Sequence, residues 1–137
     1  MTIYDYPPPV YEKAKELWGV DFDRGVVMTY GEDIYTKGHL TDDLLEHEGQ
    51  HIIQQRNYSG GKDAWWERYF TDSEFRLEQE AECYKLQLAF LIQKHGISDR
   101  QTTFNLSKAL AGQLSSPMYG SMVDILTAIN LIKPDKR

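Results

Sequence analysis

The sequence predicts a mainly α-helical α+β fold in one domain, residues 1–137. Three observations support this fold class. Apolar residues recur at helical spacing over most of the chain beyond residue 41. A short β-branched and aromatic run comes before that point, and glycine or proline separates the periodic segments. A length of 137 residues is enough for one domain with a real core.

The N-terminal part is predicted to contain one short helix and a β-hairpin. Three prolines at 7–9 precede a helix expected at residues 10–18, which ends at Gly19. Residues 26–30 and 34–36 have the composition of strands and are expected to pair with each other. Because a two-stranded ribbon is marginal alone, we expect it to lie on helices.

Five helices are predicted for the rest of the chain. The first begins at Thr41 or Asp42 and runs to about residue 58, and a short helix rich in tryptophan follows at 63–70. The longest apolar stripe predicts a helix at 73–95. The last two helices are expected at residues 98–114, starting at Ser98 or Asp99, and at 121–132.

Composition limits the classes of partner. The net charge is −6 and no cluster of basic residues occurs, so nucleic-acid binding is not expected. No apolar run is long enough to cross a membrane, and the N-terminus does not resemble a signal peptide. Cys83 is the single cysteine, which favours a reducing compartment. These features predict a cytoplasmic protein.

Five residues in the predicted helix at 41–58 carry the clearest chemical signal. They match the motif HExxH and are His47, Glu48, Gly49, Gln50 and His51. Because residues i and i+4 share a helix face, His47 and His51 can bind one metal ion. Glu48 then lies beside the ion and can take a proton from a bound water, whose pKa zinc lowers to about 7. The motif predicts a zinc centre with Glu48 as general base.

The third ligand must come from outside this motif. The extended motif HExxHxxGxxH is absent after His51, so a carboxylate from the helix at 73–95 is expected. On a helical wheel Glu80 lies about 60° from the centre of the apolar stripe, Glu78 about 100° and Glu82 about 140°. Glu80 is therefore the preferred ligand and Glu78 the alternative. Since two histidines and a carboxylate also bind iron, the metal stays open.

These segments resemble a known enzyme pattern. HExxH followed by Gln54 and Gln55, with the sequence QEAECY at 79–84, is similar to gluzincins, zinc peptidases with a glutamate ligand downstream of HExxH. More narrowly, the chain resembles small predicted metallopeptidases of tailed bacteriophages and bacteria. Their second block reads Glu-x-Glu-Ala-Tyr, with its first glutamate aligned with Glu80, and LSSPMYG at 114–120 resembles their Leu-Ser-Gly-Pro-x-Tyr-Gly segment. The resemblance covers about residues 40–122.

The resemblance implies a single metallopeptidase-like domain with a minimal gluzincin core. Zinc is the implied cofactor, and a peptide or protein is the implied substrate. An edge strand at residues 26–30 or 34–36 would bind extended substrate by backbone pairing. A phage-encoded protein of this kind would act in the host cytoplasm or with the virion, where a virion or host protein is a further partner.

Other residues are candidates for roles in the site. Amide hydrolysis needs a donor for the developing oxyanion, and Tyr119 is the preferred candidate because it lies on a turn bounded by proline and glycine. Tyr84 and His39 are alternatives. Cys83 is expected to point away from the metal, because its wheel direction differs from that of Glu80. The aromatic residues at 65–70 are expected to line a subsite or to pack in the core.

Two other functions stay open on the sequence. The first is a phage structural or host-interaction protein that keeps a non-catalytic metal site. Structural zinc sites usually have four protein ligands, and the sequence offers three, which favours the enzyme. The second is a helical interaction module in which the HExxH motif is accidental.

Overall fold

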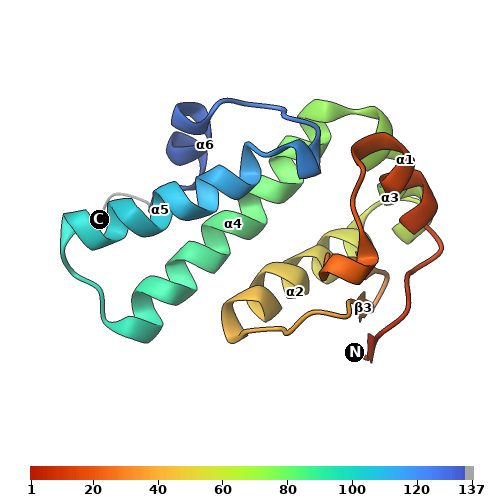
Figure 1. The fold of residues 1–137 in the computed structure, drawn as a ribbon, viewed down its shortest axis with the longest axis horizontal. Helices are drawn as coiled ribbons and strands as arrows, with labels where there is room; N and C mark the ends of the chain where they lie inside the picture. The colour runs from red at the N-terminus through yellow and green to blue at the C-terminus, as the bar shows by residue number, and fades with distance from the viewer. Residues whose placement is uncertain (135–137) are drawn as a thin grey trace.

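The computed structural model describes residues 1–134 of the protein and confirms a mainly helical α+β fold (Figure 1). The elements in chain order are β1 (Ile3–Tyr4), α1 (Tyr11–Trp18), the 3-10 helix η1 (Phe22–Arg24), β2 (Met28–Tyr30), β3 (Asp33–Tyr35), α2 (Asp42–Asn57), α3 (Gly61–Thr71), α4 (Ser73–His95), α5 (Arg100–Leu114), the 3-10 helix η2 (Pro117–Tyr119) and α6 (Ile125–Ile132). No helix within the described residues has the length and apolar composition needed to cross a membrane.

The sheet has a third strand that the sequence does not predict. Its order is β1-β3-β2, with β1 parallel to β3 and β2 antiparallel to it. Ile3 pairs with Ile34, so β3 is the central strand. Of the two alternative edge strands, residues 34–36 are therefore excluded. A strand of two residues carries no alternating pattern, so sequence reasoning could not find β1.

Helix α6 begins four residues later than predicted. The Asp124 side chain accepts a hydrogen bond from the backbone N–H of Thr127, which makes Asp124 the N-cap. Just before it, Ser121 has a positive φ of 53°, a conformation that no α-helix contains. The helix therefore starts at Ile125 and not at Ser121.

Helix α4 links two hydrophobic clusters and contacts α2, α3, α5 and α6 (Figure 1). Near its start, Phe75 packs in a cluster with aromatic residues of α1 and α3. Further along, Tyr84 and Leu88 pack in a second cluster with α5 and α6. Because α4 lies in both clusters, the face that it turns toward α2 is held firmly from both ends.

The face between α2 and α4 is polar and buried. The helices are antiparallel, because Asp42 at the start of α2 binds Lys94 near the end of α4 at 3.0 Å. Residues His47 and His51 on α2 face residues Glu80 and Gln87 on α4, and all four are buried. Their spacings of four and seven residues place each pair on one helix face. Buried polar groups need partners, so this interface determines where the candidate site lies.

Candidate metal centre

Helices α2 and α4 bring the three predicted ligands, His47, His51 and Glu80, together. The Nε2 atoms of His47 and His51 lie 3.1 and 3.2 Å from Oε1 of Glu80. Zinc bonds of about 2.0–2.1 Å in a tetrahedron place neighbouring donor atoms about 3.3 Å apart. The carboxylate oxygen is therefore as far from the two ring nitrogens as a third zinc ligand is. Because these separations also suit hydrogen bonds, the histidine tautomers decide what the group can bind.

The tautomer of His47 is fixed by a chain of hydrogen bonds behind its ring. Its Nδ1 lies 3.0 Å from Oε1 of Gln87, and Nε2 of Gln87 donates to Oδ2 of Asp43 at 2.7 Å. The bond to Asp43 turns the amide oxygen toward His47. Since an amide oxygen only accepts, Nδ1 of His47 carries the hydrogen. In the neutral ring Nε2 then has a lone pair, and it faces Glu80.

His51 is held in the same way by a second amide. Its Nδ1 lies 2.8 Å from Oε1 of Gln54, whose Nε2 donates to the backbone oxygen of Gln79 at 3.0 Å. In the neutral ring the hydrogen is thus on Nδ1, and the lone pair of Nε2 is left for a metal ion. Metal-binding histidines generally donate their other ring N–H to such a partner. Both histidines of this site meet that description.

Glu48 is buried next to the two histidines, and a residue of the sheet holds its carboxylate in place. Its Oε1 accepts a hydrogen bond of 2.9 Å from Oγ1 of Thr29 in β2. Its other oxygen, Oε2, lies 3.7 Å from Nε2 of His47. Thr29 is itself buried, so the strand fixes the position of this carboxylate.

The charges of the site favour an ionised carboxylate. Burial opposes ionisation of Glu80, but His51 and the contacts with the ring nitrogens of both histidines hold the pKa of Glu80 well below its usual range. Burial also opposes charge on His51, but Cys83 and Glu80 raise the pKa of His51 well above its usual value. Burial and Glu80 raise the pKa of Tyr69, which donates to Oε2 of Glu80 at 2.6 Å. The site therefore holds an ionised carboxylate beside the two histidines.

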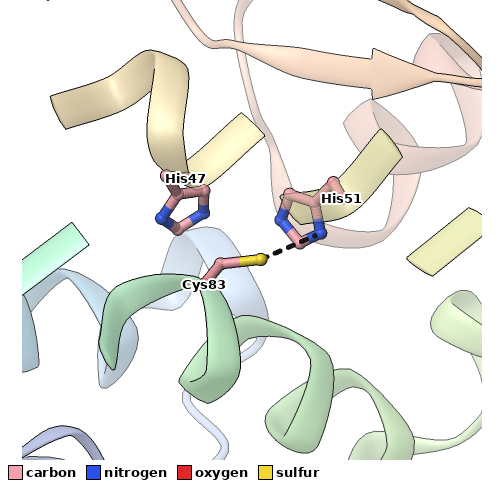
Figure 2. Close-up of side chains that lie close together, drawn as sticks. All are labelled: His47, His51 and Cys83. Carbon is pink, nitrogen blue, oxygen red and sulfur yellow. Dashed lines mark hydrogen bonds between the residues drawn. The ribbon is translucent and has the colours of Figure 1, made fainter. Parts of the chain in front are cut away.

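Cys83 is closer to the histidines than the helical wheel indicates. It is fully buried, and its Sγ lies 3.4 Å from Nδ1 of His51 (Figure 2). His47, His51 and Cys83 form a buried group with donor atoms within 4.8 Å of one another, which could hold a metal ion. The expectation that Cys83 points away is wrong, because residues three apart share a helix face, as Glu80 and Cys83 do. Burial raises the pKa of the Cys83 thiol to about 12.

The two candidate tyrosines form a pair at the site. The hydroxyls of Tyr119 and Tyr84 lie 2.6 Å apart, and both residues line the cavity beside Glu48. The ring centroid of Tyr84 is 4.4 Å from that of His47. Arg76 donates from Nε to the backbone oxygen of Tyr119 at 3.0 Å, which holds η2 in place. The structure thus brings Tyr119 near the centre as one member of a hydrogen-bonded pair.

Two of the alternative site residues, Glu78 and His39, lie elsewhere. Glu78 is exposed on α4, whereas Glu80 is only 3% exposed. His39 is exposed in the segment after β3 and does not line the cavity. These positions separate Glu80 from its competitor by burial, which agrees with the helical wheel.

The edge of β2 is partly covered. Gln55 of α2 donates from Nε2 to the backbone oxygen of Thr29 at 2.8 Å and accepts from the N–H of Gly31 at 2.7 Å. Nε1 of Trp66 donates to the same oxygen of Thr29 at 3.0 Å. Gln55 therefore makes the bonds that a neighbouring strand would make. Residues 25–28, which lead into β2, line the cavity.

A cavity of about 200 Å³ lies beside the centre and includes His47, Glu48 and Glu80 in its lining. The aromatic residues of α3 were expected to line a subsite or to pack in the core. Trp65 and Trp66 do both, because they line the cavity and belong to the first hydrophobic cluster. The core aromatics are thus also the wall of the site.

Several supporting residues were not identified from the sequence. Asp43 lies four residues before His47, and Gln87 lies seven after Glu80, so each continues a helix face already marked by a ligand. Polar residues at such buried positions are a usable signal. Thr29 reaches the site from β2, and no spacing along the chain predicts that contact.

Comparison of the chain with protein-family models, with curated proteins and with solved structures gives no match.

Proposed function

We propose that the protein is a zinc-dependent peptidase of the gluzincin type, with His47, His51 and Glu80 as metal ligands and Glu48 as general base. One observation carries this proposal. Both histidines turn Nε2 toward a buried carboxylate while an oriented amide accepts from each Nδ1. Catalytic zinc sites have three such protein ligands with outer partners, and they leave one position open.

When bound, zinc supplies a Lewis acid that lowers the pKa of a water molecule to about 7. Glu48, positioned by Thr29, accepts the proton of the attacking water and passes it to the leaving amine. The pair of Tyr119 and Tyr84 donates a hydrogen bond to the substrate carbonyl oxygen. An extended peptide or protein segment lies along residues 25–28 and pairs with the free part of the β2 edge.

Metal content and turnover test this function. Protein purified without added metal should contain about one zinc per chain, which His47→Ala should abolish. The exposed His95 gives a matched control, so His95→Ala should keep the metal. Glu48→Gln should retain zinc and lower hydrolysis of a peptide library by about 10²–10⁴-fold. Wild-type activity no greater than that of Glu48→Gln would refute the proposal.

The third ligand has its own test. Glu80→Gln should weaken zinc binding by more than about tenfold. Glu78→Gln is the control, because Glu78 is exposed on the same helix. Equal zinc affinities in the two variants would remove Glu80 from the ligand set.

A second candidate function is a non-catalytic metal site in a structural or host-interaction protein, which the position of Cys83 favours. If its thiol joined His47, His51 and Glu80, four protein ligands would fill the tetrahedron, as in structural zinc sites. However, Cys83 lies at Nδ1 of His51, whereas Glu80 lies at Nε2, and the two ring nitrogens point in different directions. Cys83→Ala separates the candidates: an enzyme keeps its zinc and activity, and a four-ligand site loses affinity by more than about tenfold.

A further inference from the structure

The cavity beside the metal centre has an apolar, accessible lining. Six of its lining side chains are apolar and half-buried, so they are open to an incoming ligand: Trp18, Val20, Val26, Val27, Leu44 and Met118. They come from the end of α1, the approach to β2, the first turn of α2 and η2. Elements distant in the sequence therefore supply one continuous apolar surface next to Glu48.

Charge in the lining is confined to the metal centre. Among the described residues that line the cavity, none is lysine or arginine, and Glu48 and Glu80 are the carboxylates. An anionic side chain entering the apolar part would lose its water and find no lysine or arginine as counter-charge, which is strongly unfavourable. An apolar side chain gains from the same loss of water. The lining thus favours apolar side chains over anionic ones.

The size of the cavity sets the size of the group that it can hold. Its volume is about 200 Å³. An apolar protein cavity of about 150 Å³ holds a benzene molecule. The space beside the centre therefore admits a side chain as large as that of leucine, methionine or phenylalanine.

We propose that this cavity binds a large uncharged apolar side chain of the substrate, in the residue next to the bond that is cleaved. The cleavage part of this proposal rests on the function proposed above. The binding part needs only the cavity, so the two can fail separately.

Binding is tested by the methionine methyl groups. Met28 and Met118 line the cavity, whereas Met1 and Met122 do not, and these are all the methionines of the chain. With ¹³C-methyl methionine labelling of the full chain, N-acetyl-phenylalanine amide should shift the resonances of Met28 and Met118 and leave the other two unchanged. N-acetyl-aspartate amide should shift none. Equal responses to the two amides, or no response to the phenylalanine amide, would overturn the proposal.

Cleavage is tested by changing the charge of the wall. In a peptide library the wild type should prefer phenylalanine, leucine or methionine over aspartate beside the cleaved bond by about tenfold or more. Val27→Lys should shift this preference toward aspartate and glutamate, because it places an amine in the cavity. Ile53→Lys is the matched control, since Ile53 is exposed on α2 and outside the lining, and should keep the wild-type preference.

The outcomes separate the two proposals. Cleavage without an apolar preference would overturn the assignment of the cavity and leave the peptidase function standing. If the phenylalanine amide shifts the methionine resonances but the protein cleaves nothing, the cavity binds apolar side chains and the peptidase function fails.

Discussion

Replacing Gln87 by leucine tests whether the hydrogen bonds behind His47 set the affinity of the metal centre. Gln87 is 2% exposed and joins Nδ1 of His47 to the carboxylate of Asp43. Leucine is similar in size and accepts no hydrogen bond, so the ring loses the partner that fixes its tautomer and orientation. Loss of such a partner lowers metal affinity by about 10–100-fold, which corresponds to about 1.4–2.7 kcal/mol.

The same substitution affects the metal-free fold, and the two effects must be measured separately. The buried N–H of His47 is left without an acceptor, which costs about 1–3 kcal/mol of unfolding free energy. Denaturant unfolding without metal gives this term, and competition with a chromophoric chelator gives the zinc affinity. Gln93 lies on the same helix and is exposed, so Gln93→Leu should change neither quantity.

A double substitution makes the test specific to this chain of bonds. Gln87→Glu alone places a second carboxylate against Asp43 and should lower the free energy of unfolding. Combined with Asp43→Asn, it restores the chain, because the introduced amide donates to the introduced carboxylate, which accepts from His47. Zinc affinity should then return to near the wild-type value. A Gln87→Leu protein that binds zinc within about twofold of wild type would refute the reasoning.

Three further predictions follow from neighbouring contacts. Thr29→Val removes the hydrogen bond to Glu48 and should lower kcat about tenfold and move the pH profile, with zinc content unchanged; an unaltered profile contradicts this. Gln55→Leu removes one of the two hydrogen bonds to the Thr29 carbonyl and leaves the N–H of Gly31 unpaired, so denaturant unfolding should show a loss of about 1–3 kcal/mol. Because the pKa of His51 is raised and only the neutral ring binds metal, zinc affinity should fall as the pH falls through that pKa. Calorimetry in buffers of different ionisation enthalpy should detect the released proton, and its absence would count against His51 as a ligand.

Much of the helical part of the fold could be predicted, because apolar periodicity acts within one element. The apolar stripe that marks α4 also indicates which face of that helix is buried, and this singles out Glu80 over Glu78. The position of Cys83 also follows from helix geometry, because it lies three residues after Glu80. A helical wheel centred on the apolar residues does not reveal it. A strand of two residues has no detectable period, so the sequence does not predict β1.

The partners of the ligands could not be predicted in the same way. Spacing along one helix shows which side chains share a face, but it does not show what packs against that face. Gln87 meets His47 only because α2 and α4 are antiparallel with this register. Thr29 meets Glu48 only because β2 packs against α2. Contacts of this kind depend on tertiary packing, which local patterns do not encode.

The amide of Gln55 has a consequence for the protein at high concentration. An open strand edge is a template on which another polypeptide can add, and uncovered edges promote aggregation. In this protein Gln55 and Trp66 occupy the backbone groups at one end of β2, and the opposite edge of the sheet is β1, with only two residues. Neither edge offers a long row of free groups. The small sheet therefore exposes little surface on which copies of the chain would assemble by strand addition.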